Sequence, residues 1–309
     1  MNSYTIFENS FFGMGRGLLF QHPDYYRLHA GDAGIYFELC SQSETVACAH
    51  FTPVDDQGTW RSPARGTFAG ISFSEDLKYK DLLAFYESIE AKLKSRGAAR
   101  LEILLPPQAH GASSFANQIY LLRSAGFEIT QCDLNHSLQV DLQNLSDRMT
   151  YGNVKRLRKC QRDGLSAIQL QIGDLPKVYE TLRLNRASKG HEMSMTLEQI
   201  EKMVETFPHD VFLFGCQHED HLAAASLCLR LSPTVLYVFY WGDRPEYASY
   251  SPVVAVADAI YRFCQGEGFS ILDVGTSTID RVPNLGLIDF KRGLGFLESI
   301  KVRMQKTLL

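Results

Sequence analysis

The chain has 309 residues, of which 45% are hydrophobic and 21% charged, as in an ordinary globular protein. A net charge of −4 disfavours a large nucleic-acid surface, the apolar windows are too short to span a membrane, and the N-terminus lacks the basic region of a signal peptide. The seven cysteines are scattered without a CxxC pair, which favours reduced, buried thiols and a cytoplasmic location.

The first half of the sequence predicts three strands, a helix and a closing strand. The runs GIYFELC and TVACAHF flank a polar turn, and a third short strand is expected at Thr67–Phe73. A helix is predicted over Tyr79–Arg96, because its apolar residues recur on one helical stripe. Gly97 then ends the helix, and the strand Arg100–Leu105 comes next.

The middle of the chain reads as a separate segment. A strand is expected at Leu138–Leu142, followed by a basic helix within SDRMTYGNVKRLRKCQRDG and by the strand AIQLQI. Two helices come next, Leu175–Lys189 and Thr196–Phe207, and the second opens with capping-box spacing. Together with the length prior of roughly 150 residues per domain, this segment predicts two domains, 1–145 and 146–309.

The second half repeats the order of the first. Strands are predicted at DVFLFGC, LAAASLCLRL and VLYVFYWG, then a helix over Pro252–Gln265 and the strand FSILDVG. Three residue pairs keep one fixed offset between the halves: Phe68 with Phe239, Gly97 with Gly268, and Glu102 with Asp273. We interpret the chain as a tandem duplication, and a single α/β domain with chance similarity is the alternative.

The C-terminal stretch PNLGLIDFKRGLGFLESIKV resembles the closing motif of FemABX-like proteins of the GNAT superfamily, and the matched residues are Gly286, Leu287, Phe290, Lys291 and Gly295. The junction around the basic helix is similar to that family too. The resemblance implies an α/β fold (α+β, mixed sheet) of two tandem GNAT-like acyl-CoA N-acyltransferase domains, with the active site in the second. It also implies transfer of an acyl or aminoacyl group to an amine. The long helical arm of many aminoacyl-tRNA users is absent from this sequence.

Three residues are expected to be catalytic. An ammonium at Lys291 would stabilise the negative charge that acyl transfer builds on a carbonyl oxygen. Phe290 would exclude water or stack on a donor ring, and Tyr240, or alternatively Tyr237, would give a proton to the leaving group. The alternative is a solvated lysine beside aromatic residues that only pack in the core.

Four residues are expected to bind the donor. In acetyltransferase folds the donor lies against the strand that here contains Trp241 and Gly242, where it pairs like an added strand. Tyr250 and Ser251 precede the helix at Pro252, whose N-terminus suits a phosphate. Tyrosine and serine occupy the place of the glycines found in standard acetyl-CoA users.

Three further residues are expected to bind the acceptor substrate. The basic helix carries Arg156 and Lys159, which the resemblance selects for phosphate contacts. Asp273 in the last strand of the second repeat would orient an amine. The alternative for the basic helix is a solvated charged face.

The sequence therefore predicts an N-acyltransferase that moves an acyl group from an acyl-CoA, or a similar thioester, to an amine of a cell-envelope, polysaccharide or lipid precursor. The expected partner is a small-molecule or a glycan- or lipid-linked amine acceptor. A tRNA-dependent aminoacyltransferase and a non-catalytic binding module on the same scaffold are the alternatives. No tightly bound cofactor, metal, DNA or transmembrane segment is expected, and a homodimer stays open. The segments GMGRG and HEDH are interpreted as a loop and a strand turn rather than as phosphate and metal sites.

Overall fold

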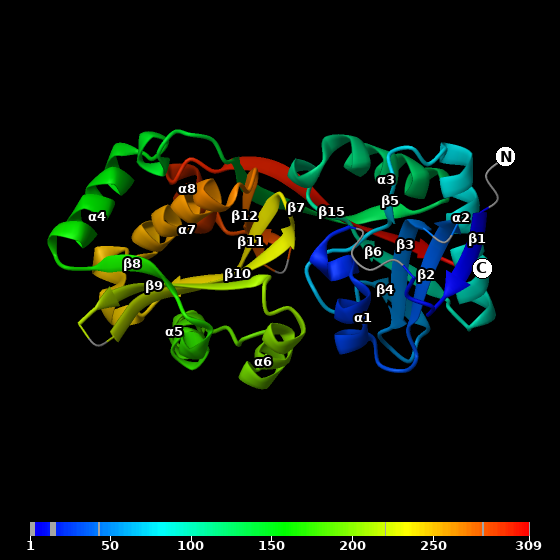
Figure 1. Ribbon diagram of the computed structural model, residues 1–309, viewed down its shortest axis with the longest axis horizontal. Helices are drawn as coiled ribbons and strands as arrows, with labels where there is room; N and C mark the ends of the chain where they lie inside the picture. Colours follow the sequence, from blue (N-terminus) through cyan, green and yellow to red (C-terminus); the bar gives the residue numbers. More distant parts are fainter. Residues whose placement is uncertain (1–3, 13–16, 43, 220, 280, 309) are drawn as a thin grey trace. The chain divides into compact units, whose positions relative to one another are not determined.

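The computed structural model describes two compact units (Figure 1). The first comprises Met1–Asp133 and Ile300–Leu309, and the second comprises Leu134–Ser299. Each contains β-strands with helices packed against them, which confirms the α/β class. The domain limits 1–145 and 146–309 stay a prediction. The described residues are 4–12, 17–42, 44–219, 221–279 and 281–308; most of GMGRG and the third residue of HEDH lie outside them.

In its described residues, the first unit contains three α-helices, two short 3-10 turns and six strands of its own. The helices are α1 (Pro23–Ala30), α2 (Tyr79–Ser95) and α3 (Ala112–Ser124), and the turns are η1 (Leu19–Gln21) and η2 (Gln108–His110). The strands are β1 (Tyr4–Glu8), β2 (Ile35–Ser41), β3 (Glu44–Pro53), β4 (Thr59–Ser62), β5 (Ser72–Phe73) and β6 (Arg100–Leu104).

The sheet of this unit runs in the order β1-β2-β3-β4-β6, with β4 and β6 parallel. The apolar stripe predicted for α2 is buried against it, from Leu82 to Leu93. The strand expected at Thr67–Phe73 is wrong in extent, because only Ser72 and Phe73 pair with β3. The strand beside β6 is β4, which sequence patterning missed because four residues are too few to show a period.

Over the part of it that the structure describes, the second unit contains five α-helices, three 3-10 turns and seven strands of its own. The helices are α4 (Tyr151–Arg162), α5 (Leu175–Ala187), α6 (Leu197–Thr206), α7 (Val253–Glu267) and α8 (Leu285–Gly293). The strands are β8 (Ser166–Leu170), β9 (Val211–His218), β10 (His221–Ser232), β11 (Val235–Asp243), β12 (Ile271–Thr276), β13 (Thr278–Ile279) and β14 (Val282–Pro283). The turns are η3 (Leu145–Asp147), η4 (Ile172–Asp174) and η5 (Pro245–Tyr250).

The sheet of the second unit runs in the order β12-β11-β10-β9-β8, and α7 lies in its core. Most of the residues of α7 are buried, as expected for a helix that is apolar on nearly every side. The helix ends at Gly268, whose φ of +76° is the left-handed conformation that glycine adopts without strain. In α6, Thr196 and Gln199 form the predicted capping box.

Two long strands exchange between the halves of the sequence. β7 (Glu128–Gln139) comes after the first repeat in the chain, yet its C-terminal part pairs with β12 in the second unit. β15 (Leu297–Thr307) comes after the second repeat, yet it pairs with β6 in the first unit. Each unit thus takes its last strand from the other half of the sequence. The strand expected at Leu138–Leu142 is the end of β7, which stops at Gln139, so the expected strand is wrong beyond that residue.

The duplication is visible in the elements, although one residue equivalence is wrong. Gly97 and Gly268 both end a helix with positive φ, at +83° and +76°. Glu102 and Asp273 both lie on the strand that pairs in parallel with its neighbour. Phe68, however, lies in a loop, whereas Phe239 lies in β11. The strand of the first unit that is equivalent to β11 is therefore β4, because each pairs in parallel with the strand after the helix.

Two further sequence-based expectations concern helices and thiols. Within the described part of the chain, no helix combines the length and apolarity needed to cross a bilayer. Six of the seven cysteines are buried, Cys132 is exposed, and all seven are free thiols. The burial of six of these thiols agrees with the prediction, and their reduced state stays a prediction.

Candidate functional site

A cavity of about 720 Å³ opens in the second unit, where two parallel strands separate. β11 and β12 pair only over Val235–Tyr237 and Ile271–Asp273. Beyond that point β11 continues along β10 as far as Asp243, while β12 stays paired with β7. The edge of β11 that faces away from β10 therefore has no strand beside it after Tyr237 in the described structure, and the cavity lies there.

A glycine bulge in β12 forms one wall of the cavity. The pairing of β12 with β7 shifts register between Asp273 and Thr276, and Gly275 between them has a φ of +74°. A Cβ atom at Gly275 would also lie 3.3 Å from the Tyr237 hydroxyl. Both the backbone conformation and the space therefore favour glycine, and the bulge leaves the carbonyls of Gly275 and Thr276 free to accept bonds outside the sheet.

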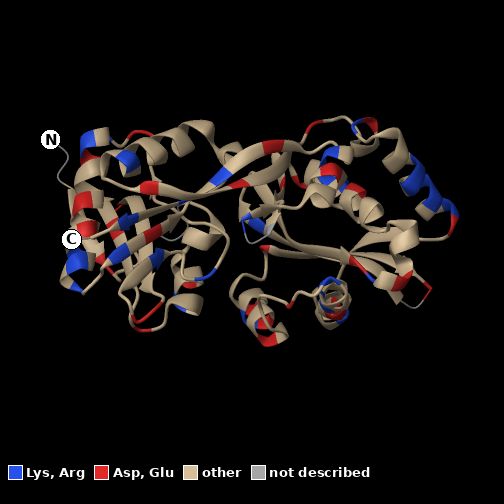
Figure 2. Cartoon of the chain, turned by 180° about the vertical axis from the view of Figure 1, so that it is seen from behind, with Lys and Arg blue, Asp and Glu red and all other residues tan. Residues whose placement is uncertain are grey.

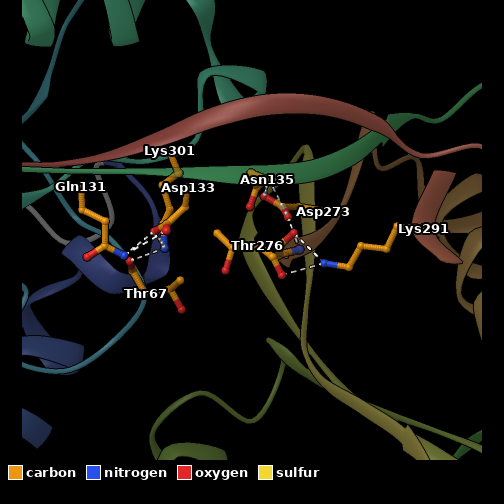
Figure 3. Close-up of polar contacts among 9 residues, drawn as sticks. Thr67, Gln131, Asp133, Asn135, Asp273, Thr276, Lys291 and Lys301 are labelled. Atoms are coloured by element: carbon orange, nitrogen blue, oxygen red, sulfur yellow. Dashed lines mark hydrogen bonds and ion pairs between the residues drawn. The ribbon is translucent and has the colours of Figure 1, made fainter. Parts of the chain in front are cut away.

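Lys291 reaches these carbonyls from α8. Its side chain is only 1% exposed, and Nζ donates to the Gly275 oxygen at 2.8 Å and to the Thr276 oxygen at 2.9 Å (Figure 3). Desolvation lowers the pKa of Lys291 to about 7, and the nearby Asp273 carboxylate opposes that shift. Two of the three ammonium protons are thus used by the described partners, and the third position remains for a ligand in the cavity that Lys291 lines.

Asp273 lies beneath the cavity wall rather than in it. Its carboxylate is fully buried, accepts two bonds from Asn135 Nδ2 at 3.1 Å each, and accepts another from the Gly275 amide at 2.6 Å. Burying a charge is tolerated when it is hydrogen-bonded and close to an opposite charge. Asp273 therefore holds the bulge and supplies a negative charge near Lys291.

A buried histidine supports the same bulge from β7. His136 is 0% exposed, and its Nδ1 lies 3.2 Å from the Ser277 hydroxyl, one residue beyond the carbonyls that hold Lys291. Burial, helped by the Lys291 charge, lowers the pKa of His136 to about 4. His136 is therefore neutral at physiological pH and adds no competing charge to the site.

Aromatic side chains of β11 and α8 form the opposite wall. Tyr240 is buried, its hydroxyl is hydrogen-bonded to the Ser194 hydroxyl, and burial raises its pKa. Trp241 and Phe290 meet edge to face with ring centroids 5.9 Å apart. Tyr240 therefore keeps its proton at neutral pH, and the Trp241–Phe290 pair packs between the cavity and the core.

α5 closes the cavity on a third side, at a position where only glycine fits. A Cβ atom at Gly242 would lie 2.5 Å from Asn185. Asn185 Nδ2 donates to the backbone oxygen of Asp243 at 2.6 Å and to its carboxylate at 2.9 Å. This contact fixes α5 directly on the free edge of β11.

Six of the ten predicted site residues line this cavity: Lys291, Phe290, Tyr240, Trp241, Gly242 and Ser251. Ser251 has a left-handed φ of +53°, and α7 begins after it at Val253, one residue later than predicted. The lysine predicted on α8 and the serine predicted before α7 thus line the same cavity.

The other four predicted residues lie outside the cavity lining. Asp273 is beneath it, and Lys159 packs over the Tyr250 ring at 4.5 Å while Nζ donates to the Ser249 oxygen. Arg156 donates to Asn153 Oδ1 at 2.7 Å. Both basic residues belong to α4, which Figure 2 shows with Lys and Arg along most of its length.

Sequence reasoning missed the contribution of α5. Five residues of this helix and the turn after it line the cavity: Leu182, Asn185, Arg186, Lys189 and His191. The helix itself was predicted, and 182, 185, 186 and 189 share one face at helical spacing. The only sign of a site in the sequence was this stripe of polar and apolar residues on one face of the helix. The sequence alone does not show which other element that face packs against.

Among the described residues, no cluster of three or more His, Cys, Asp and Glu side chains is arranged to hold a metal ion. His218 and His221 face each other across the β9–β10 hairpin, which agrees with the turn predicted for HEDH. In the described part of the chain, the ionisable and hydroxyl side chains that line the cavity are those of Arg186, Lys189, His191, Tyr237, Tyr240, Asp243, Ser251, Thr276 and Lys291.

Comparison with known proteins links this geometry to a fold. No protein-family model and no curated protein sequence matches the chain. Solved structures do: FemX aligns with a TM-score of 0.73 and 13% identity over 97% of this chain and 95% of its own. The chain has the tandem GNAT fold of FemX. The FemABX-like and GNAT-like fold expected from the sequence is confirmed.

Two other solved structures also align with most of this chain. The C-terminal domain of a putative lysylphosphatidylglycerol synthetase from Agrobacterium fabrum aligns with a TM-score of 0.60 and 10% identity, over 85% of this chain and 82% of that chain. A tandem GNAT protein from the clavulanic acid biosynthesis pathway aligns with a TM-score of 0.55 and 13% identity, over 90% and 84%. At such identities the likeness extends to the fold and not to the substrate.

Proposed function

We propose that the chain is an N-acyltransferase that moves an acyl group from an acyl-CoA, or a similar thioester, to an amine. The observation that carries this proposal is the cavity at the separation of β11 and β12, with the Lys291 amine held at its wall by two carbonyls. The tandem GNAT fold supports it, because the structures that share the fold include a domain of a putative lysylphosphatidylglycerol synthetase and a tandem GNAT protein of a biosynthetic pathway.

The donor is proposed to lie along the free edge of β11. Backbone groups of Phe239–Gly242 would pair with the amides of an extended pantetheine-like arm, as in the addition of a strand to a sheet. Ser251 and Val253 also bring the N-terminus of α7 to the cavity, and the positive end of that helix dipole favours an anionic group. The cavity is thus suited to an elongated donor with a charged end.

The reaction is proposed to use charge stabilisation and one proton donor. The acceptor nitrogen attacks the thioester carbon, the new N–C bond forms, and negative charge develops on the carbonyl oxygen. Through its remaining N–H group, the Lys291 ammonium would donate a hydrogen bond to that oxygen. When the C–S bond breaks, Tyr240 would protonate the thiolate, and the proton lost by the attacking amine would leave to solvent.

Two variants test this proposal. Lys291→Met removes the amine and keeps much of the side-chain volume, and Lys301→Met is the matched control, because Lys301 is also buried but lies in the first unit, near Asp133. Turnover with an acyl-CoA panel should fall about 10²–10³-fold in Lys291→Met while thermal stabilisation by CoA persists. Full turnover in Lys291→Met would reject this role for the lysine. Stabilisation of the wild-type chain by CoA without turnover of any acyl-CoA would favour a non-catalytic binding module.

A second candidate is a tRNA-dependent aminoacyltransferase. The basic face of α4 favours it, because Lys155, Arg158 and Arg162 are exposed there and Tyr151, 72% exposed, lies against Lys155. Such a face suits phosphates and base stacking. Thermal-shift titration with acyl-CoAs and with aminoacyl-tRNA separates the two donors: stabilisation by CoA compounds alone would reject the tRNA donor.

A further inference from the structure

The cavity of the second unit has a cationic side, formed by α5 and the turn after it. Arg186, Lys189 and His191 line the cavity there. Asp243 is the one carboxylate among the described lining residues, and its Oδ1 already accepts a bond from Asn185. The lining therefore has an excess of positive charge beyond the Lys291 amine.

Other basic residues of α5 are neutralised, whereas those in the cavity are not. Lys177 pairs with Asp174 at 3.1 Å, and Arg183 forms a two-pronged pair with Glu180. Within the described structure, Arg186 and Lys189 have no carboxylate at ion-pair distance. The helix thus pairs cations on its outer side and leaves two unpaired on the side that faces the cavity.

Neutral groups hold both unpaired cations in place. Arg186 Nε donates to the Glu192 backbone oxygen at 2.7 Å, and its guanidinium carbon lies 5.7 Å from the centre of the Tyr240 ring. Lys189 Nζ donates to Asn185 Oδ1 at 3.1 Å. Two like charges three residues apart on a helix repel each other. An anion bound in the cavity beside Arg186 and Lys189 would offset this repulsion.

We propose that the acceptor is an anionic amine, whose carboxylate or phosphate binds between Arg186 and Lys189 while its amine reaches the donor near Lys291. This inference rests on the proposed acyl transfer and specifies the class of acceptor. The guanidinium offers two parallel N–H groups to a planar or tetrahedral anion, and Lys189 adds a point charge. Tyr240, which the Arg186 guanidinium overlies, connects the anion site to the reacting centre.

Paired acceptors test the proposal. Transfer is measured with ethanolamine against O-phosphoethanolamine, and with glycinamide against glycine, so that each pair differs in the anion. We expect a kcat/KM at least about tenfold higher for the anionic member of at least one pair, and the pair that shows it identifies phosphate or carboxylate. Arg186→Gln and Lys189→Gln should each raise KM for that acceptor about 10- to 100-fold and reduce the preference. The donor KM should stay constant.

Arg183→Gln is the matched control, because Arg183 lies on the same helix but is paired with Glu180 and is not part of the lining. Equal kcat/KM for both members of both pairs, or equal losses in Arg183→Gln and Arg186→Gln, would overturn the proposal.

Direct binding separates failure of the anion site from failure of the transferase function. Calorimetric titration with inorganic pyrophosphate should show binding to the wild-type chain and weaker binding to the Arg186→Gln/Lys189→Gln double variant. If no amine is acylated and pyrophosphate still binds in this way, the anion site stands and acyl transfer is rejected. If amines are acylated and pyrophosphate binds both proteins alike, the anion site is rejected.

Discussion

The parallel strand pairs β4/β6 and β11/β12 are equivalent in the two units, but their side-chain contacts and the chain that follows them differ. In each, a carboxylate lies on the second strand: Glu102 opposite Arg61, and Asp273 opposite Tyr237. In the first unit Arg61 Nε pairs with Glu102 at 2.7 Å. In the second unit Tyr237 cannot pair with Asp273 in this way, and a buried lysine lies near the carboxylate instead.

The course of the chain after the first strand of each pair explains the difference. β4 ends at Ser62, and the next residues fold back, so that Phe68 and Ala69 are fully buried and the Ala69 amide donates to the Leu104 oxygen at the end of β6. β11 instead continues as a strand to Asp243, and the space beside it stays open. In the first unit, the few residues that fold back after β4 fill the space beside β6. In the second unit, the corresponding space beside β11 forms the cavity.

The largest expected effect concerns the charge that only the open pair buries. The pKa of Lys291 is about 7 in the folded chain and near its ordinary value when unfolded, so between pH 7 and 10 the unfolded chain binds more protons. Stability should therefore rise with pH in that range, by on the order of a few kcal/mol relative to Lys291→Met. Urea denaturation of both proteins at several pH values measures this. Parallel stability curves would show that the amine is not desolvated.

A smaller effect is expected where α5 meets β11. Gly242→Ala forces a Cβ atom into Asn185, so the free energy of unfolding should fall by about 1–3 kcal/mol and turnover should fall with it. Gly97→Ala in the first unit is the comparison: that position has open space and strains only the backbone, by about 1–2 kcal/mol, without loss of turnover. Equal turnover in both variants would mean that the contact between α5 and β11 does not shape the site.

The matched carboxylates provide the last test. Asp273 raises the pKa of Lys291, so Asp273→Asn should lower that pKa further and reduce the ammonium fraction. Turnover at pH 7 should fall roughly tenfold for each unit of pKa lost, and the alkaline limb of the rate profile should move to lower pH. Glu102→Gln should leave the profile unchanged and cost about 0–1 kcal/mol of stability, since Arg61 is partly exposed. An unchanged pH–rate profile in Asp273→Asn would show that the Asp273 carboxylate does not influence the pKa of Lys291.

Most long elements were predictable because their apolar periods are long. α2, α5, α7 and the hairpin β9–β10 carry enough residues for a period to emerge, and Gly97 and Gly268 mark helix ends by a conformation other residues avoid. The four residues of β4 carry no such period. The exchange of β7 and β15 is not encoded in any local pattern, because pairing partners lie far apart in the chain.

The site was predictable where a motif marks it and not where packing makes it. Lys291 and Phe290 belong to a recognisable segment, and Ser251 precedes a helix start. Arg186 and Lys189 look like ordinary charges of a surface helix until Gly242 brings α5 onto β11. Asn135 and His136 support the bulge from a strand whose partner sequence patterning did not reveal.

The exchanged last strands make the two halves of the gene product depend on each other during folding. β6 is synthesised early, but its neighbour β15 emerges from the ribosome roughly 200 residues later. Until then the edge of β6 stays without that partner, and closing so long a loop is slow. The first-made sheet is therefore complete only after β15 has been made, and a chain stopped between the repeats would present an unpaired strand edge prone to aggregation.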